Sequence, residues 1–155
     1  MTPEHTFESI LGDLLQAKVD FILVGGLAVE LCGFTRTTLD VDILVEDSEA
    51  NTAKLTESLR DFADGVAAEL TAVDFLPEEG CIRIVDEFAL DIFTRMTGKS
   101  YYDLMPFTAE YQHRQGTLKY LSPEGLILLK KDSLRPKDQI DVLELKKLHG
   151  ETGGG

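Results

Sequence analysis

The stretch Arg36-Thr-Thr-Leu-Asp-Val-Asp-Ile-Leu-Val45 decides the fold, because its acidic and apolar residues alternate as they do in a β-strand. Asp40 and Asp42 occupy alternate positions, so both carboxylates project from one face of the predicted strand. The other face carries apolar residues that point into a core: Leu39, Val41, Ile43 and Val45. Two neighbouring carboxylates repel each other unless a cation lies between them, and Mg²⁺ binds one or two carboxylates together with substrate phosphates. A strand edge that faces solvent would show the same alternation, and that alternative stays open.

Upstream, Val24-Gly25-Gly26-Leu27-Ala28 places two glycines between a strand predicted at 20–24 and a helix predicted at 27–32. Glycine permits a tight turn and a close approach of the backbone to a ligand. A turn that binds an anion and an ordinary turn are both compatible with this pattern. The chain has no Gly-x-Gly-x-x-Gly motif and no complete Gly-x-x-x-x-Gly-Lys-Ser/Thr motif, which excludes the dinucleotide-binding and P-loop interpretations.

Downstream, a hairpin is predicted from strands at 81–85 and 88–93, and the second strand carries a single acid, Asp91. A lone carboxylate among apolar neighbours is costly unless it is paired or binds a metal. An ion pair with Arg83 or Arg95 is the alternative to a metal-binding role. Arg36 lies four residues before Asp40, and its alternative is a solvated loop charge.

The remaining pattern predicts one α/β domain at 1–150, with a small mixed sheet flanked by helices and a tail at 151–155. The core spans about 1–121 and a C-terminal helical segment spans about 122–150. A helix is predicted at 7–18, and another runs from its Ser48 cap to about 62. The region 100–121 predicts a short helix near Tyr101 and one or two strands, including 117–121. The last helices are predicted at 122–131 and 136–150.

Composition limits the partners of the chain. Its 155 residues are 43% apolar, which is typical of a globular domain, and no apolar run is long enough to span a membrane. The net charge of −13 disfavours strong unaided binding to nucleic acid, although basic residues gather near the C-terminus. The acidic N-terminus lacks the features of a signal peptide. Cys32 and Cys81 show no metal-type spacing and are interpreted as buried thiols. We expect a cytoplasmic protein.

The chain resembles the minimal nucleotidyltransferases of the DNA polymerase β superfamily. That motif consists of Gly-Gly or Gly-Ser after an apolar residue, then Asp-x-Asp on a strand, then a third acid on a later strand. Gly25-Gly26, the Asp40/Asp42 pair and Asp91 match these parts in order. Arg36 to Asp42 is most similar to the Arg-x-Ser/Thr-x-Asp-x-Asp run of the abortive-infection (AbiEii-like) toxin/antitoxin branch. The segment 130–142 resembles the basic-rich Asp-x-x-Asp segment of the same group.

The resemblance implies an α/β nucleotidyltransferase fold and transfer of a nucleoside monophosphate from a nucleoside triphosphate such as ATP. It implies two Mg²⁺ ions, with Mn²⁺ as a substitute, held by the catalytic carboxylates Asp40, Asp42 and Asp91. It further implies nucleotide binding by Gly25, Gly26, Arg36, Thr38, Lys130 and Lys137. Asp138 is implied in activating the acceptor or closing the site, and its alternative is an acid that stabilises a helix N-terminus.

The acceptor stays open at this point. An RNA, a protein or a small molecule could receive the nucleotide, and a partner antitoxin or toxin protein is also implied by the resemblance. The acidic composition suits a cationic small molecule or a basic protein better than bulk RNA. The second hypothesis is a non-catalytic relative that binds a nucleotide or a partner protein. Such relatives usually lose one of the acids, whereas this chain retains all three, which favours catalysis.

Overall fold

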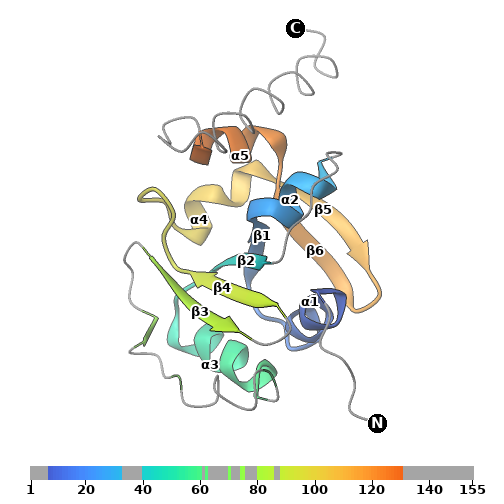
Figure 1. Cartoon of the computed structure of the whole chain (residues 1–155), viewed down its shortest axis with the longest axis vertical. Helices are drawn as coiled ribbons and strands as arrows, with labels where there is room; N and C mark the ends of the chain where they lie inside the picture. Colours follow the sequence, from blue (N-terminus) through green and yellow to red (C-terminus); the bar gives the residue numbers. More distant parts are fainter. Residues whose placement is uncertain are drawn as a thin grey trace, which may run out of the picture.

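The computed structural model describes residues 7–32, 40–60, 62, 70, 74–75, 80–85 and 88–130. Six strands form one sheet in the order β3-β4-β2-β1-β6-β5 (Figure 1). The strands are β1 (Phe21–Val24), β2 (Asp40–Val45), β3 (Cys81–Val85), β4 (Ala89–Phe93), β5 (Thr108–His113) and β6 (Gly116–Leu121). The helices are α1 (Phe7–Gln16), α2 (Gly25–Leu31), α3 (Glu49–Ser58), α4 (Tyr101–Leu104), the 3-10 turn η3 (Met105–Phe107) and α5 (Pro123–Lys130).

The sheet is mixed, as the sequence predicts. β2 runs antiparallel to β1 and parallel to β4, so it has hydrogen-bonded neighbours on both sides. β1 is parallel to β6 on its other side. The pairs β3–β4 and β5–β6 are antiparallel hairpins at the two edges. The Asp-x-Asp strand is therefore central, and the alternative of a solvent-facing edge strand is wrong.

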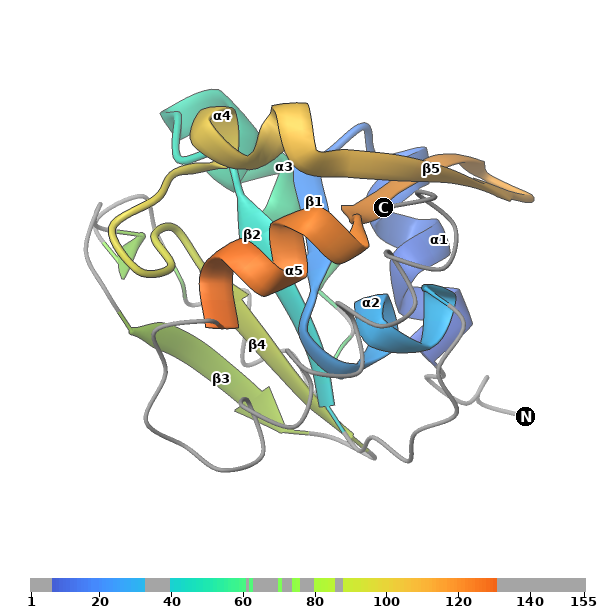
Figure 2. The same cartoon turned by 90° about the horizontal axis from the view of Figure 1, so that it is seen from above.

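Two apolar clusters cover the two faces of the sheet. On one face, α1 and α3 pack against Val41, Ile43 and Val45 of β2. On the other face, α4 and α5 pack against Ile22, Val24 and Leu44. Figure 2 shows α5 lying across β1 and β2, consistent with the contacts of Leu126 and Leu129 in this second cluster. Burial on both faces explains why Ile43-Leu44-Val45 is continuously apolar and fully buried.

The strand period of two places Asp40 and Asp42 on the same face as Leu44. Leu44 is fully buried in the second cluster, whereas Asp40 and Asp42 are only half-buried at the start of the strand. The second face of β2 therefore changes from polar to apolar along its length. The two carboxylates therefore lie at the polar, half-buried end of this face.

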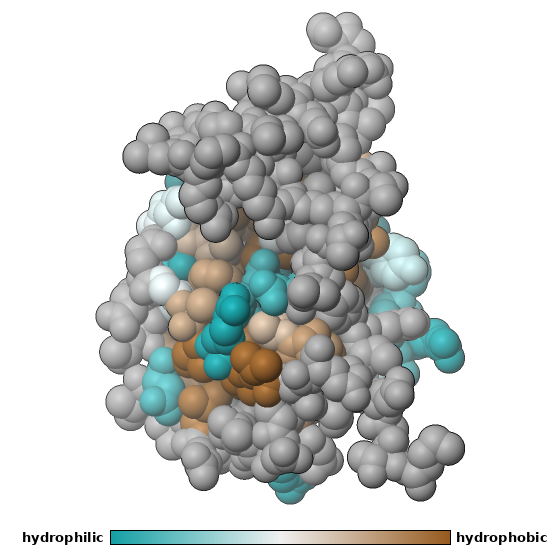
Figure 3. All heavy atoms as spheres, in the orientation of Figure 1, coloured by the Kyte–Doolittle hydropathy of each residue, from teal (hydrophilic) through white to brown (hydrophobic). Residues whose placement is uncertain are grey.

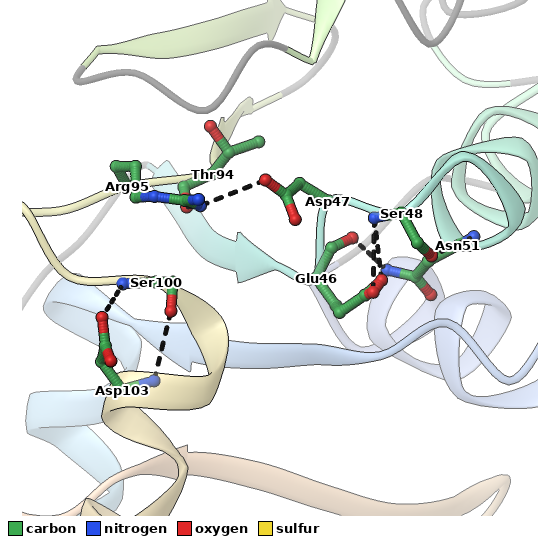
Figure 4. A network of polar contacts seen from close by, with 8 residues as sticks. All are labelled: Glu46, Asp47, Ser48, Asn51, Thr94, Arg95, Ser100 and Asp103. Atoms are coloured by element: carbon green, nitrogen blue, oxygen red, sulfur yellow. Dashed lines mark hydrogen bonds and ion pairs between the residues drawn. The ribbon is translucent and has the colours of Figure 1, made fainter.

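A polar network anchors the far end of β2 to α3 (Figure 4). Ser48 caps α3, accepting a hydrogen bond from the Asn51 backbone N–H at 3.2 Å. The buried Asn51 amide donates to the backbone oxygens of Asp20 (3.0 Å) and Glu46 (2.7 Å), and accepts from Asp20 N–H (2.7 Å). Glu46, also buried, accepts from the Ser48 N–H at 2.8 Å. These bonds satisfy backbone groups that the strand ends would otherwise leave unpaired.

Several predicted boundaries need correction. α2 begins at Gly25 and not at 27, and α3 ends at Ser58 because Leu59 leaves helical geometry and is buried with Phe62. The region 100–121 contains two full strands, of which β5 was not specifically predicted. The predicted helix at 136–150 and the tail lie outside the described residues. Among the helices that the structure describes, none has the length and hydropathy to cross a membrane.

Candidate active site

Strand register brings the acids together. In the sheet, Asp42 of β2 pairs with Val24 of β1 on one side and with Asp91 of β4 on the other. Paired residues on neighbouring strands project from the same face, so the Asp42 and Asp91 carboxyl groups meet and share a hydrogen bond. Asp40 projects from the same face one pleat earlier. Asp40, Asp42 and Asp91 therefore converge on one face of the sheet and form a carboxylate cluster.

Arg83 completes this cluster from the edge strand β3, where it pairs with Asp91. Its Nε donates to Oδ1 of Asp91 at 2.8 Å and its Nη2 donates to Oδ2 at 2.9 Å. The same Nη2 lies 3.6 Å from Oδ2 of Asp40. The Asp91 side chain is 6% exposed, whereas that of Arg83 is 55% exposed. The predicted alternative, an ion pair of Asp91 with Arg83, is therefore present alongside the carboxylate cluster. Arg95 instead pairs with Asp47.

The surroundings of Asp42 raise the pKa of its carboxyl group. Burial, the hydrogen bond to Asp91 and the charges of Asp91 and Asp40 raise the pKa of Asp42 from 3.8 to about 7, against an opposing effect of Arg83. Asp42 therefore keeps its proton near neutral pH, because Arg83 only partly compensates the negative charges of Asp40 and Asp91. Oxygen donors of this kind suit a hard divalent cation such as Mg²⁺.

The fit to a metal is best at Asp40 and Asp42. Both oxygens of Asp91 already accept hydrogen bonds from Arg83, so Asp91 has less capacity to bind an ion in this arrangement. Within the described part of the chain, no three His, Cys, Asp or Glu side chains are grouped as a ready-made metal site. The donor chemistry thus fits one divalent ion, and the number of ions implied by the resemblance stays a prediction.

The Gly25 turn is shaped by the carboxylate opposite it. Gly25 has a positive φ of 71°, which disfavours other residues. A Cβ built on Gly25 would overlap Oδ2 of Asp42 and would lie 2.9 Å from its Cγ. Glycine is therefore required here both for the backbone conformation and for the seat of the Asp42 carboxylate. Gly26 follows as the second residue of α2, and its role in binding a nucleotide stays a prediction.

The other predicted site residues are not tested by the structure. Arg36, Thr38, Lys137 and Asp138 lie outside the described residues. Lys130 is the last residue of α5, and its side chain is outside the described atoms. The helix that carries Lys130 does contact α2, the helix that begins at Gly25.

Cys81 is a residue that the sequence argument did not place in the site. It lies on the same face of β3 as Arg83, is exposed, and shares a side-chain hydrogen bond with Asp91. Burial and the Asp91 charge raise the pKa of its thiol. The prediction that both thiols are buried is wrong for Cys81, because β3 is an edge strand. Cys32 is half-buried, and burial raises its pKa to about 11.

A cavity of about 200 Å³ lies away from these acids, at the opposite end of β1. It is lined by Phe21, which pairs with Val45, whereas Asp42 pairs with the other end of β1. Its polar lining comprises Lys18, Asp20, Tyr101, Thr117 and Lys119. Figure 3 shows a small hydrophilic patch beside a hydrophobic area over β3 and β4. None of the three acids lines this cavity; Asp91 is buried and Asp40 and Asp42 are half-buried.

Two solved structures share the fold. The lincomycin-bound crystal structure of the lincosamide antibiotic adenylyltransferase LnuA superposes with a TM-score of 0.55 at 19% identity, covering 94% of this chain and 99% of that one. A crystal structure from Thermotoga maritima, described as "a putative nucleotidyltransferase (TM1012)", superposes with a TM-score of 0.50 at 17% identity, covering 92% of this chain and 89% of that one. A search of the curated proteins finds no match.

The family is shown by a match over most of the sequence. Residues 6–151 match the family described as "Nucleotidyltransferase of unknown function (DUF6036)". This range includes both glycines of the turn and all the acids of the cluster. The mixed sheet with flanking helices is also the nucleotidyltransferase fold of the two solved structures. The chain therefore belongs to the DUF6036 family of nucleotidyltransferases.

Proposed function

We propose that the chain is a Mg²⁺-dependent nucleotidyltransferase that moves a nucleoside monophosphate from a nucleoside triphosphate to an acceptor hydroxyl or phosphate. The observation that carries the proposal is the convergence of Asp40, Asp42 and Asp91 on one sheet face, with the pKa of Asp42 raised to about 7. Such charge is unfavourable in an empty site and becomes favourable when a divalent cation binds.

In this mechanism Asp40 and Asp42 would hold the cation, which would neutralise phosphate charge and help to orient the triphosphate. The Gly25-Gly26 turn positions the triphosphate beside Asp42. Asp91 accepts the proton of the acceptor hydroxyl as its oxygen attacks the α-phosphorus. The bond from that phosphorus to the bridging oxygen breaks, and pyrophosphate leaves. Arg36, Thr38, Lys130 and Lys137 contact the phosphates, and Asp138 acts on the acceptor side.

The acceptor that we favour is a cationic small molecule or a basic protein. The net charge of −13 would repel the phosphates of bulk RNA and would attract a cationic acceptor. One solved structure of similar fold is an adenylyltransferase of a lincosamide antibiotic, which makes small-molecule acceptors a reasonable class to test first.

The test is incubation with each labelled nucleoside triphosphate, Mg²⁺ and fractions of small molecules, RNA and protein. We expect label to move to one acceptor class, and Asp42→Asn to lower the rate about 100-fold or more, because loss of a charged ligand weakens stabilisation of the transition state. Asp47→Asn is the matched control, since Asp47 pairs with Arg95 outside the cluster. Transfer by Asp42→Asn at the rate of the unmodified protein would refute the proposal. Nucleotide binding without transfer would favour the non-catalytic alternative.

A toxin or antitoxin role forms the finer part of this proposal. It rests on the likeness of Arg36 to Asp42 to the abortive-infection branch. If the chain acts as a toxin, its expression should slow growth of the host, and Asp42→Asn should relieve that effect at equal protein level. Equal toxicity of the two proteins would separate any growth effect from nucleotide transfer.

A further inference from the structure

Arg83 is the cation that the carboxylate cluster already contains, and the family resemblance gave it no role. It forms a bidentate ion pair with Asp91 and also approaches Asp40. Register across the sheet places it there, because Arg83 of β3 pairs with Asp91 of β4, which pairs with Asp42 of β2. The pair is therefore built into the sheet and is not a chance contact of a long side chain.

We infer that Arg83 is a resident counter-cation that competes with divalent metal for the cluster and limits the nucleotide-free site to one ion at Asp40 and Asp42. The inference rests on the proposed function, because it concerns the same site. Once a bound ion has displaced the proton that Asp42 shares with Asp91, one guanidinium beside three ionised carboxylates leaves two negative charges, which one divalent ion balances. A second divalent ion would give the site an excess of positive charge before any phosphate arrived.

The contact geometry indicates that Arg83 competes with a metal ion for the carboxylates and does not help to bind that ion. Both oxygens of Asp91 are engaged by Arg83 at 2.8 and 2.9 Å, so an ion binds Asp91 well only when the guanidinium withdraws. The 3.6 Å approach of Nη2 to Asp40 brings the same positive charge next to an expected metal ligand. Repulsion between like charges at such short range weakens binding of the ion.

Withdrawal of Arg83 is physically accessible. β3 is the edge strand of the sheet, and the Arg83 side chain is 55% exposed, so it can turn into solvent without opening the core. Asp91, in contrast, is almost completely buried and belongs to a strand that has neighbours on both sides. The moving partner of the pair is therefore Arg83, and Asp91 stays in place to receive a cation.

The experiment measures Mn²⁺ binding to the full chain without nucleotide, by equilibrium dialysis with electron paramagnetic resonance of free Mn²⁺ near pH 8. We expect the unmodified protein to bind one ion. Arg83→Met should raise the affinity about tenfold and make a second ion detectable, because the competing charge is gone. Without metal, Arg83→Met should lower the melting temperature, and Mn²⁺ should restore it.

Two further variants separate charge from structure. Arg95→Met removes the same charge from the pair with Asp47, away from the cluster, and should leave the Mn²⁺ affinity within about twofold. Arg83→Lys keeps the charge and loses the bidentate geometry, so its affinity for Mn²⁺ should remain close to that of the unmodified protein. It also provides a folded comparison if Arg83→Met is unstable.

The outcomes distinguish this inference from the proposed function. Equal or weaker Mn²⁺ binding by Arg83→Met would overturn the inference, since Arg83 would then support the site or be indifferent to it. A tenfold gain in Arg95→Met would also overturn it, because total charge alone would explain the effect. No Mn²⁺ binding by the unmodified protein would overturn both the inference and the proposed metal dependence. One bound ion with no response to Arg83 would leave the proposed function intact.

Discussion

At the scale of the residue, Asp42 is the position where local sequence and tertiary structure act together. Its place in the strand points it to the polar face, and its neighbours then determine its protonation. In the metal-free protein it shares a hydrogen bond with Asp91, which requires a proton between two carboxyl groups. The proton and a divalent cation are therefore alternative ways to relieve the same repulsion.

This coupling predicts how stability depends on pH. Because the pKa of Asp42 is about 7 in the folded state and 3.8 as an ordinary carboxyl group, the folded protein binds more protons in that window. The stability that the protonated Asp42 contributes is fully present below pH 3.8 and is lost as the pH rises through about 7. The shift corresponds to at most about 4 kcal/mol. Because Asp42 keeps some contact with water, we expect a loss of roughly 1–2 kcal/mol in EDTA between about pH 5 and pH 8.

Asp42→Asn should remove this loss and be the more stable protein near pH 8, as measured by urea unfolding. The Asn amide can still donate a hydrogen bond to Asp91. Asp103→Asn is the control. Hydrogen bonds with Ser100 lower the pKa of Asp103, so Asp103 contributes a constant amount to stability between about pH 5 and pH 8 and its substitution should leave the pH slope unchanged. A pH slope in Asp42→Asn equal to that of the unmodified protein would show that other groups carry the effect.

At the scale of the element, the junction of β1 and α2 is formed around the Asp42 carboxylate. Gly25 ends the strand with positive φ and opens the helix, and its missing side chain leaves the space that the carboxylate occupies. The turn therefore serves two purposes: it reverses the backbone and it seats an acid of the neighbouring strand.

Gly25→Ala should separate these purposes when compared with Gly98→Ala. Both glycines have positive φ, 71° and 77°, but a Cβ at Gly98 meets nothing within 4 Å. Each substitution should cost about 1–2 kcal/mol of stability from backbone strain, measured by urea unfolding. Only Gly25→Ala should also weaken Mn²⁺ binding, by about tenfold or more, since it displaces the Asp42 carboxylate. Equal Mn²⁺ affinities of the two variants would show that the close approach is unimportant for the site.

At the scale of the whole molecule, the dominant feature is the excess of acid. The chain has 28 acidic and 15 basic residues, and the structure adds a cluster of acids that Arg83 partly compensates. Repulsion among like charges opposes the compact state and is screened by salt.

We therefore expect NaCl to stabilise the metal-free protein. Raising NaCl from about 0.02 M to about 0.5 M near pH 7.5 should increase the melting temperature by about 2–4 °C, corresponding to roughly 1 kcal/mol. Near the isoelectric point of about 4.5 the same addition should have little effect, because the net charge is then small. A decrease of the melting temperature at neutral pH would show that attractive surface pairs outweigh the repulsion.

The sequence by itself determined the strands other than β5, the shared face of Asp40 and Asp42, the glycine turn and the Ser48 cap. These features depend on local periodicity and on hydrogen bonds within a few residues, which are visible in one stretch of chain. β5 was not specifically predicted because its run Thr-Ala-Glu-Tyr-Gln-His is mostly polar and none of its residues is buried; it becomes a strand by pairing with β6.

Only the tertiary structure decided which acid meets which partner. Asp91 is far from Asp42 in the chain, and their alignment is set by the register of β2 against β4, where a slip of one residue would turn Asp91 to the opposite face. The register of β3 against β4 in turn selects Arg83 over Arg95 as the partner of Asp91 and brings Cys81 beside them at an exposed edge. Register arises from packing of both sheet faces at once, so no single stretch of sequence contains it.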